Sequence, residues 1–376
     1  MSIASALGLG KKVRYAVVGL GNITQGAFLP GVRGTGNSEV TAFVSGDAEK
    51  AREVAKRHGV KDIYDYAEFD RMLASGSIDA IYLATPNWRH AEFAVPALQA
   101  GIHVLAEKPL DVSVAKAESI LSAQRKSSAK LMVAYRLHFE PATLDAIRRI
   151  REGELGDLVM FTSAFGQNVD PRNHRATNAE LAGPLLDMAP YPINATRYLF
   201  GDEPVEVAAA VGSRHPEAGL GDMDDTVAVT LRYPGNRLAQ FTVSYVTSGI
   251  DSFIVAGTKG SIHMSPAFGY KSGLEQNRMV GGTKTHQAFK HTDQFGGELR
   301  YFSDCILNDR APEPDGEEGL ADLRVLEGIF KALETGKAVK LAPLDRRRRI
   351  DVSEQEQTLT PSTGPEPVNA PSPARE

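Results

Sequence analysis

The sequence predicts an α/β protein of two domains, and three observations support this prediction. The chain has 376 residues, more than one hydrophobic core usually holds. Up to about residue 134, short apolar runs alternate with stretches of helical periodicity. This alternation is typical of a parallel sheet with helices on both faces. Beyond residue 135, alternating runs joined by glycine-containing turns predict a mostly antiparallel sheet.

The N-terminal domain is predicted to span residues 12–134. We expect strands at 14–18, 40–44, 79–84, 103–106 and 131–134. We expect helices between or after them at 48–58, 67–74, 89–100 and 112–127. Strands and helices that alternate at this spacing predict a doubly wound domain.

The C-terminal domain is predicted to span residues 135–344. Alternating apolar runs at 226–233 and 238–245 flank Pro234-Gly235-Asn236, which is a hairpin signal. The runs at 252–256 and 261–264 form a second predicted hairpin around residues 257–260. A helical stretch at 316–335 is expected to return and pack against the body of the protein.

Both ends of the chain are expected to lie outside the two cores. Residues 1–11 resemble a short flexible arm, without the charged and apolar regions of a signal peptide. Residues 345–376 contain no aromatic side chain and are rich in Ser, Thr, Glu and Pro, which predicts a disordered tail. We interpret the arginines at 346–349 as a solvated charge cluster; the alternative is a site for an acidic partner.

Composition excludes several classes of protein. A net charge of -5 argues against a nucleic-acid-binding protein. The chain has no run of about 18 apolar residues, so no membrane span is predicted. A single cysteine, Cys305, excludes internal disulfides and a cysteine-based metal site. These features favour a cytoplasmic location, although a disulfide-free exported protein would have the same composition.

The first chemical motif is Gly19-Leu20-Gly21-Asn22-Ile23-Thr24, directly after the first strand. Glycines at 19 and 21 allow a tight turn and the close approach of a pyrophosphate, whose charge a helix N-terminus favours. Thr24 stands where the fingerprint usually has a third glycine or alanine. The position of the motif in the first strand–helix turn predicts a Rossmann domain that binds a dinucleotide.

The end of the second strand distinguishes between dinucleotides. An acidic residue there usually binds the ribose 2′-hydroxyl of NAD. Here the strand ends at Ser45 and Gly46, and Lys50 follows at the start of the next helix. A small neutral residue beside a lysine favours the 2′-phosphate of NADP. The alternative is that Asp47 binds NAD and that Lys50 and Arg52 are ordinary exposed residues.

Two further loops follow strands of the predicted parallel sheet, where ligands bind. Pro86, Asn87 and His90 lie in the loop after the strand at 79–84 and are expected to border the cofactor. The alternatives are that Asn87 caps a helix and that His90 is a packed helix residue. Glu107-Lys108-Pro109 follows the strand at 103–106. Lys108 can act as a general acid or base if burial and neighbouring charges lower its pKa, and Glu107 is then expected to orient it. The alternative is that Lys108 is an ordinary surface lysine at the end of a strand.

Together these motifs resemble the glucose–fructose oxidoreductase/inositol dehydrogenase (Gfo/Idh/MocA) family over residues 12–340, and most closely its glucose–fructose oxidoreductase branch. The motifs that carry the resemblance are Gly19-x-Gly21, Val44 to Lys50, Ile63-Tyr64-Asp65-Tyr66, Thr85-Pro86-Asn87-x-x-His90, Glu107-Lys108-Pro109, Tyr135-Arg136-x-His138, Asn194 to Leu199 and Gly316-Glu317-Glu318-Gly319.

The resemblance implies an N-terminal Rossmann domain and a C-terminal α/β domain whose large open sheet commonly builds a dimer or tetramer. It implies catalytic roles for Lys108, Asp187 and Tyr191, because Asp187-Met188-Ala189-Pro190-Tyr191 matches a segment that carries Asp and His in many members. The branch also has tyrosine in place of this histidine. Contacts to NADP are implied for Ser45, Lys50, Tyr66, Glu107, Arg136 and Tyr270.

The expected activity is NADP-dependent oxidation of the C1 hydroxyl of an aldose to an aldonolactone. In one version, the reduced cofactor stays bound and reduces a second sugar. The alternatives are a dehydrogenase or reductase of another polyol or a trans-dihydrodiol with a dissociable cofactor, or a non-catalytic nucleotide sensor. No metal is expected, because a turn before the strand at Thr226 explains Asp222, Asp224 and Asp225 as well as a cation does.

Overall fold

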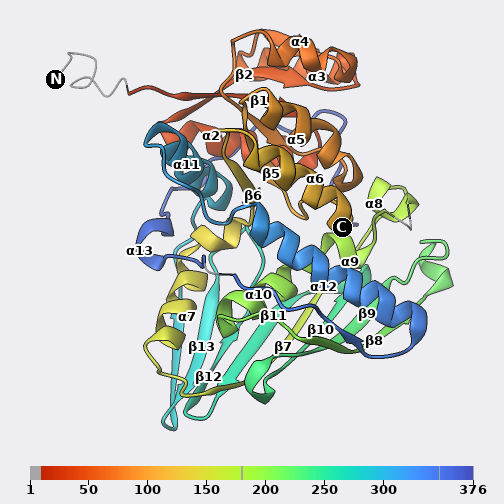
Figure 1. The fold of residues 1–376 in the computed structure, drawn as a ribbon, viewed down its shortest axis with the longest axis vertical. Coiled ribbons are helices and arrows are strands. Elements are labelled where there is room, and N and C mark those ends of the chain that lie inside the picture. The colour runs from red at the N-terminus through yellow and green to blue at the C-terminus, as the bar shows by residue number, and fades with distance from the viewer. Residues whose placement is uncertain (1–9, 179–180, 347, 376) are drawn as a thin grey trace.

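The computed structural model describes residues 10–178, 181–346 and 348–375 (Figure 1). All but the last two residues of the arm predicted at 1–11 lie outside this range. No helix in the part of the chain that the structure describes is both long enough and apolar enough to cross a membrane.

The N-terminal domain contains a parallel sheet with strand order β3-β2-β1-β4-β5-β6. The strands are β1 (Val13–Val18), β2 (Ser38–Val44), β3 (Asp62–Tyr64), β4 (Ala80–Leu83), β5 (His103–Glu107) and β6 (Leu131–Ala134). This order is that of a dinucleotide-binding Rossmann domain, which confirms the predicted parallel sheet. β3 is absent from the sequence-based expectation, because three residues are too few to show a periodicity.

Helices cover both faces of this sheet because successive side chains of each strand point to opposite sides. Ala16 and Val18 of β1 belong to one hydrophobic core, and Tyr15 and Val17 belong to the other. The helical segments of this domain are η1 (Thr24–Phe28), α2 (Leu29–Thr35), α3 (Ala48–His58), η2 (Tyr66–Glu68), α4 (Phe69–Leu73), η3 (Asn87–Arg89), α5 (His90–Gln99) and α6 (Val114–Arg125).

One helix from the second half of the chain also packs on the Rossmann sheet. α11 (Gln294–Leu307) contributes Leu299 and Phe302 to the core that contains Tyr15 and Val17. The hydroxyl of Ser303 lies 2.8 Å from the Tyr15 hydroxyl. Although the sequence assigns α11 to the second domain, its packing joins it to the first, and Figure 1 shows it beside α2.

The second sheet has nine strands in the order β14-β13-β12-β11-β7-β10-β9-β8-β15. The strands are β7 (Leu158–Asn168), β8 (Glu206–Ser213), β9 (Thr226–Arg232), β10 (Leu238–Ser244), β11 (Val246–Gly257), β12 (Gly260–Met264), β13 (Glu275–Val280), β14 (Thr283–Ala288) and β15 (Val339–Lys340). All neighbouring pairs are antiparallel except β7 and β10. Both predicted hairpins are confirmed, as the pairs β9–β10 and β11–β12.

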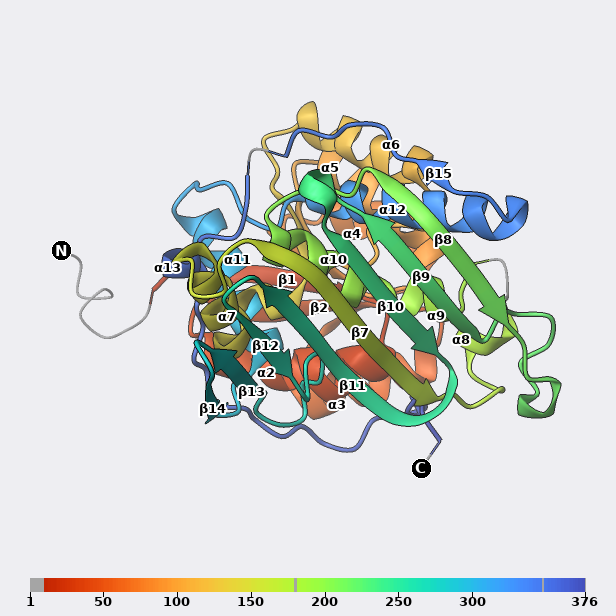
Figure 2. The ribbon, with the colours of Figure 1, turned by 90° about the horizontal axis from the view of Figure 1, so that it is seen from below.

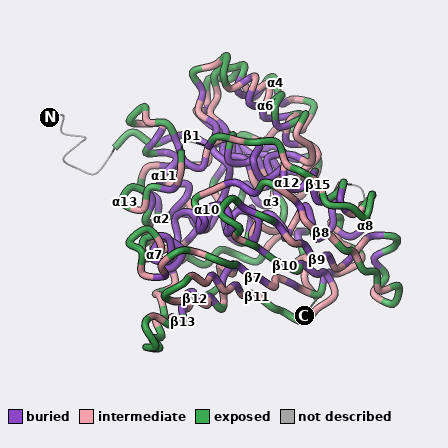
Figure 3. Tube along the Cα trace, turned by 60° about the horizontal axis from the view of Figure 1, so that its bottom comes forward, coloured by how far each residue is buried: buried purple, intermediate pink, exposed green. Residues whose placement is uncertain are grey.

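Helices cover only one face of the second sheet. α7 (Pro141–Arg151), α10 (Pro190–Phe200) and α12 (Gly316–Thr335) lie between this sheet and the Rossmann domain (Figure 1). Seen from below in Figure 2, strands β7 to β11 form the face nearest the viewer, with no helix in front of them. Figure 3 shows buried chain gathered around β1 and α10, and exposed chain at the outer ends of β12 and β13. The remaining helical segments here are η4 (Arg136–Phe139), α8 (His174–Thr177), α9 (Pro184–Asp187), η5 (Pro216–Ala218) and η6 (Pro234–Asn236).

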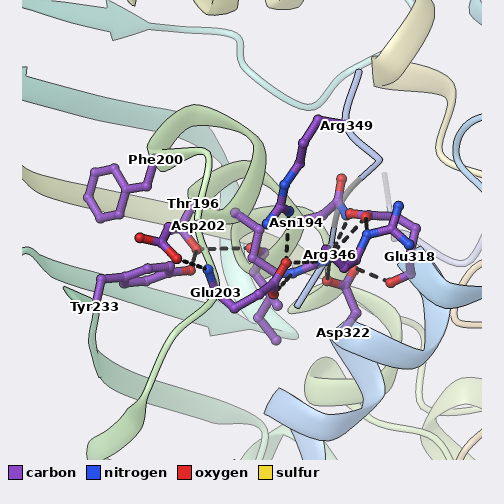
Figure 4. Close-up of polar contacts among 12 residues, drawn as sticks. Asn194, Thr196, Phe200, Asp202, Glu203, Tyr233, Glu318, Asp322, Arg346 and Arg349 are labelled. Atoms are coloured by element: carbon purple, nitrogen blue, oxygen red, sulfur yellow. Dashed lines mark hydrogen bonds and ion pairs between the residues drawn. The ribbon is translucent and has the colours of Figure 1, made fainter. Parts of the chain in front are cut away.

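A buried guanidinium joins α10 to α12. Arg197 of α10 is fully buried and forms ion pairs of 2.6 Å with each of Glu203, Glu318 and Asp322 (Figure 4). Burial alone would raise the pKa of Glu318, but the guanidinium groups of Arg197 and Arg346 lower it to about 2. Buried charges are tolerated only when they are paired, so this cluster fixes the two helices relative to each other.

The segment from residue 345 onward differs from the predicted disordered tail. Arg346 is buried and lies 2.8 Å from Asp315 and 3.1 Å from Glu313, while Arg349 lies 2.7 Å from Glu203. The arginine run is therefore more than a solvated cluster, with Arg347 outside the described residues. A short helix, α13 (Val352–Gln355), follows. The composition of this segment does not reveal the contacts of Arg346 and Arg349, because the partners of these two arginines lie elsewhere in the chain.

Candidate active site

A cleft of about 950 Å³ lies where the Rossmann domain meets the second domain. Its walls include the loops after β1, β2, β4 and β5, which is the edge of a parallel sheet where ligands bind. The predicted site residues that line it are Gly19, Gly21, Asn22, Ile23, Ser45, Gly46, Lys50, Tyr66, Pro86, Asn87, Glu107, Lys108, Arg136, Asp187, Tyr191 and Tyr270.

The glycine turn after β1 has the close approaches that the motif implies. Gly19 has a φ of 97°, and a Cβ at this position would lie 2.6 Å from the carbonyl oxygen of Ala84. A Cβ on Gly21 would meet no atom within 4 Å, so the backbone there is open to a ligand. The hydroxyl of Thr24 donates to the Gly19 carbonyl at 2.8 Å, which explains how the turn tolerates threonine at the third position of the motif.

The end of β2 carries the groups expected to distinguish NADP from NAD. Asp47 is the N-cap of α3, and its carboxylate accepts the Lys50 amide at 2.9 Å. The Ser45 hydroxyl and the Lys50 side chain line the cleft at this point. Gly46 lies under Tyr66, since a Cβ there would be 3.1 Å from the ring. The Lys50 ammonium lies 3.9 Å from the Asp47 carboxylate and lines this end of the cleft, so a cation stands where a phosphate would bind.

His90 does not line the cleft, contrary to its predicted role in cofactor binding. Its ring is fully buried, with one nitrogen 3.1 Å from the Pro109 carbonyl and the other 3.2 Å from the Thr85 carbonyl. Burial lowers the pKa of His90. The imidazole therefore holds the loop after β4 against the loop after β5, as a packed helix residue. Sequence position alone does not separate a residue facing this cleft from one beneath it.

The three predicted catalytic residues come together at the inner end of the cleft. The Lys108 ammonium donates to the main-chain carbonyl of Asp187 at 2.7 Å and lies 3.6 Å from its carboxylate. The same nitrogen lies 4.5 Å from the centre of the Tyr191 ring. A guanidinium nitrogen of Arg136 donates to the Tyr191 hydroxyl at 3.1 Å. Cations next to the phenol oxygen stabilise negative charge that develops on it.

Asp187 is surrounded by groups that keep its carboxylate charged. The Tyr245 hydroxyl donates to it at 3.0 Å, and Arg175 lies at 3.4 Å. Burial would raise the pKa of Asp187, but Arg175, Lys108 and Tyr245 lower it below its ordinary value. Sequence reasoning did not identify Arg175 or Tyr245 as site residues. The sequence does contain a signal for Tyr245. Alternate residues of β10 are buried, and Tyr245, directly after this strand, continues the alternation.

Glu107 has a different partner from the one expected. It was expected to orient Lys108, but it accepts the Tyr82 hydroxyl at 2.6 Å, while Lys108 is directed to Asp187. Burial raises the pKa of Glu107, and burial together with the Glu107 carboxylate raises the pKa of Glu298. Glu107 is thus a half-buried carboxyl at the wall of the cleft whose hydrogen-bond partner is Tyr82 and not Lys108.

Arg136 connects the phenol to the floor of the cleft. It donates to the Phe268 carbonyl at 2.5 Å and to Gln294, and its guanidinium lies 5.2 Å from the centre of the Tyr270 ring. Two further histidines lie near the site: His174 lines the cleft, and His138 is buried against Asn194 at 2.7 Å. Among the described residues, no group of three or more His, Cys, Asp or Glu side chains has the arrangement of a metal site.

The glycine turn yields a matched pair of variants. Gly19→Ala should destabilise the fold, because it combines a positive φ with a 2.6 Å contact to main chain. Gly21→Ala places the same methyl group in open space, so thermal unfolding should stay unchanged while dinucleotide affinity falls. Thermal melts and binding titrations of both variants test this. Equal melting temperatures, or full affinity in Gly21→Ala, would contradict our account of the turn.

Two family models match the chain. One, described as an oxidoreductase family with an NAD-binding Rossmann fold, matches residues 13–135. The other, described as the GFO/IDH/MocA C-terminal domain, matches residues 143–263.

Individual relatives agree with these models. D-xylose 1-dehydrogenase (NADP+) of Haloarcula marismortui is 33% identical over 88% of this chain and 93% of its own. Trans-1,2-dihydrobenzene-1,2-diol dehydrogenase of Homo sapiens is 32% identical over 60% of this chain and 66% of its own. The crystal structure of aldose-aldose oxidoreductase from Caulobacter crescentus, complexed with glycerol, matches with a TM-score of 0.83 and 34% identity, covering 88% of this chain and all of that one. The chain therefore belongs to the GFO/IDH/MocA family of oxidoreductases.

Proposed function

We propose that this protein is an NADP-dependent oxidoreductase that oxidises the C1 hydroxyl of an aldose to an aldonolactone. The observation that carries this proposal is the cluster of Lys108, Asp187 and Tyr191 at the inner end of the cleft. It provides a tyrosine that accepts a proton as its phenolate, cations that favour this phenolate, and a carboxylate that binds a hydroxyl. The D-xylose dehydrogenase and aldose-aldose oxidoreductase relatives support a sugar as substrate.

Tyr191 is the proposed base. It takes the proton from the C1 hydroxyl as the C1–H bond breaks and a C1=O bond forms. Arg136, which donates to its hydroxyl at 3.1 Å, and Lys108, 4.5 Å from its ring, stabilise the negative charge that makes it a base. Asp187, held by Tyr245 and Arg175, accepts a hydrogen bond from a second sugar hydroxyl and so orients the ring.

NADP is the proposed cofactor, and it accepts the hydride from C1 when bound. Gly21 leaves room for its pyrophosphate, and Ser45 and Lys50 would hold its 2′-phosphate. Tyr66, Pro86 and Asn87 line the same part of the cleft. The name of the Haloarcula relative, which specifies NADP+, supports this choice.

Two versions of the reaction fit the site. In one, NADPH leaves after each turnover. In the other, NADPH would stay bound and would supply the hydride for the reduction of a second sugar to an alditol, and Tyr191 would return the proton. The relationship to trans-1,2-dihydrobenzene-1,2-diol dehydrogenase supports an alternative substrate, a cyclic trans-diol, for the same proton-transfer residues.

The first prediction concerns the proton-transfer residues. Lys108→Ala and Tyr191→Phe should lower kcat for NADP reduction by D-xylose or D-glucose by about 100- to 10,000-fold. Both variants should still bind NADPH. Tyr198→Phe removes a phenol hydroxyl from the same helix outside the main cleft and should retain activity. Wild-type rates in both site variants would refute the mechanism.

The second prediction concerns cofactor choice. Lys50→Ala should weaken NADP binding by about 10- to 100-fold, the usual effect of losing a charge-assisted hydrogen bond, and leave NAD binding unchanged. Arg52→Ala is the control, because Arg52 is exposed on the same helix and does not line the cleft. Fluorescence titrations with both dinucleotides measure the effect. Tighter binding of NAD than NADP by the wild-type protein would overturn the assignment.

We also propose that the chain forms a homodimer or homotetramer through the uncovered face of its second sheet. Met160 and Leu238 are cross-strand neighbours on β7 and β10, and they are 42% and 39% exposed. Exposed apolar side chains gathered on one sheet face are typical of a subunit interface.

Light scattering after size exclusion tests this interface. The double variant Met160→Asp/Leu238→Asp should reduce the molar mass, because it buries two charges at the contact. Phe330→Asp, on the opposite layer in α12, should leave the mass unchanged. A monomeric wild-type protein, or an unaltered mass in the double variant, would exclude the proposed interface.

A further inference from the structure

We infer that residues 366–374, here named the closing segment, form part of the nucleotide site and slow the release of the dinucleotide. The inference rests on the proposed function, because it assumes that the cleft holds NADP. It concerns a stretch for which the sequence predicts no structure and no role.

The closing segment forms one wall of the cleft. Residues 369–374 line the same cavity as Gly21, Ser45, Lys108 and Tyr191. Ala370 is buried, although Asn369 and Pro371 on either side of it are exposed. A ligand that fills the cleft therefore contacts this wall as well as the glycine turn.

On one side the closing segment is attached to the Rossmann domain. Asn22, in the glycine motif, donates its side-chain amide to the Ala370 carbonyl at 2.9 Å. The Gln25 side chain makes two hydrogen bonds to the main chain of Val368, of 3.0 and 2.8 Å. Arg57 of α3 donates to the Glu366 carbonyl at 2.7 Å. The attachment thus lies at the turn expected to hold the pyrophosphate.

On the other side the closing segment is attached to the second domain. The Asp170 amide donates to the Pro373 carbonyl at 2.9 Å, and Ala374 pairs with Val169 in a β-bridge. The Arg375 amide donates to the Asn168 carbonyl at 2.7 Å. These residues lie at the end of β7. The segment therefore connects the two domains across the cleft, and they cannot separate widely there until one attachment breaks.

The path to the closing segment is also held in place. It begins at Arg346 and Arg349, which pair with Glu318 and Glu203, two of the carboxylates around Arg197 (Figure 4). From α13 it runs past α2 and α3 to the end of β7 (Figure 2). The Ser362 hydroxyl donates to the Pro30 carbonyl at 2.6 Å, and a Cβ on Gly364 would lie 2.7 Å from the Pro30 ring.

Proline explains how so few contacts order this stretch. Prolines at 361, 365, 367, 371 and 373 each restrict φ, so the free chain has fewer conformations to lose. The hydrogen bonds to the two domains then need to offset less conformational entropy than an ordinary polar tail would require.

The decisive experiment measures the rate at which NADPH leaves the protein. The wild-type protein and a truncation that ends at residue 365 are loaded with NADPH and mixed with excess NADP, and nucleotide fluorescence is followed. The truncation should release NADPH at least about tenfold faster, which corresponds to the loss of two or three ordinary hydrogen bonds. Limited proteolysis gives a second readout: NADPH should protect the closing segment in the wild-type protein from cleavage.

Because a truncated protein can misfold for other reasons, two full-length variants test the same inference. Gly364→Val places a side chain against Pro30 and should displace the segment and speed release. Thr363→Val changes the exposed neighbouring residue and is the control. It should leave the release rate of NADPH unchanged. Wild-type release rates in both the truncation and Gly364→Val would overturn the inference, even though Lys50→Ala still weakened NADP binding. Failure of the wild-type protein to bind NADPH at all would instead overturn the proposed function and this inference with it.

Discussion

The pairing of Arg197 with three carboxylates is the constraint on which the second domain and its part of the site depend. A guanidinium without access to water is stable only when its charge is matched, so α10 cannot rotate or slide relative to α12. Tyr191 stands at the start of α10. The position of the proposed base is therefore determined by ion pairs near the other end of its helix. The same cluster receives Arg346 and Arg349, so it also holds the beginning of the C-terminal segment.

Around the cleft, the placement of charge matters more than the identity of any one residue. Lys108, Arg136 and Arg175 surround a single carboxylate and a single phenol. Lys108 and Arg175 lower the pKa of Asp187, and Arg136 donates a hydrogen bond to the Tyr191 hydroxyl. Glu107, next to Lys108 in the chain, and Glu298 have raised pKa values, chiefly because of burial. The site thus combines Asp187, whose pKa is lowered, with Glu107, whose pKa is raised, and both line the cleft.

The two domains are interwoven, although the chain order suggests two consecutive units. α11 comes from the second half of the sequence but completes a core of the Rossmann sheet. The C-terminal segment returns along the Rossmann domain and ends beside β7. Motion of one domain relative to the other is therefore limited by segments that belong to both. In a site formed between domains, such segments influence how readily a bound dinucleotide leaves.

The sequence by itself determined the features that rest on local chemistry. Apolar periodicity predicted the Rossmann strands other than β3 and the hairpins β9–β10 and β11–β12, and Gly19 and Gly21 predicted the turn, because each depends on neighbouring residues. The motifs at Lys108 and Tyr191 predicted which residues meet, through resemblance to a family. Only the tertiary structure decided that His90 packs beneath the cleft, that Glu107 pairs with Tyr82, that Arg175 and Tyr245 hold Asp187, and that residues 369–374 line the cleft. Each of these depends on partners distant in the chain, and no local pattern encodes which distant side chain a polar group will meet.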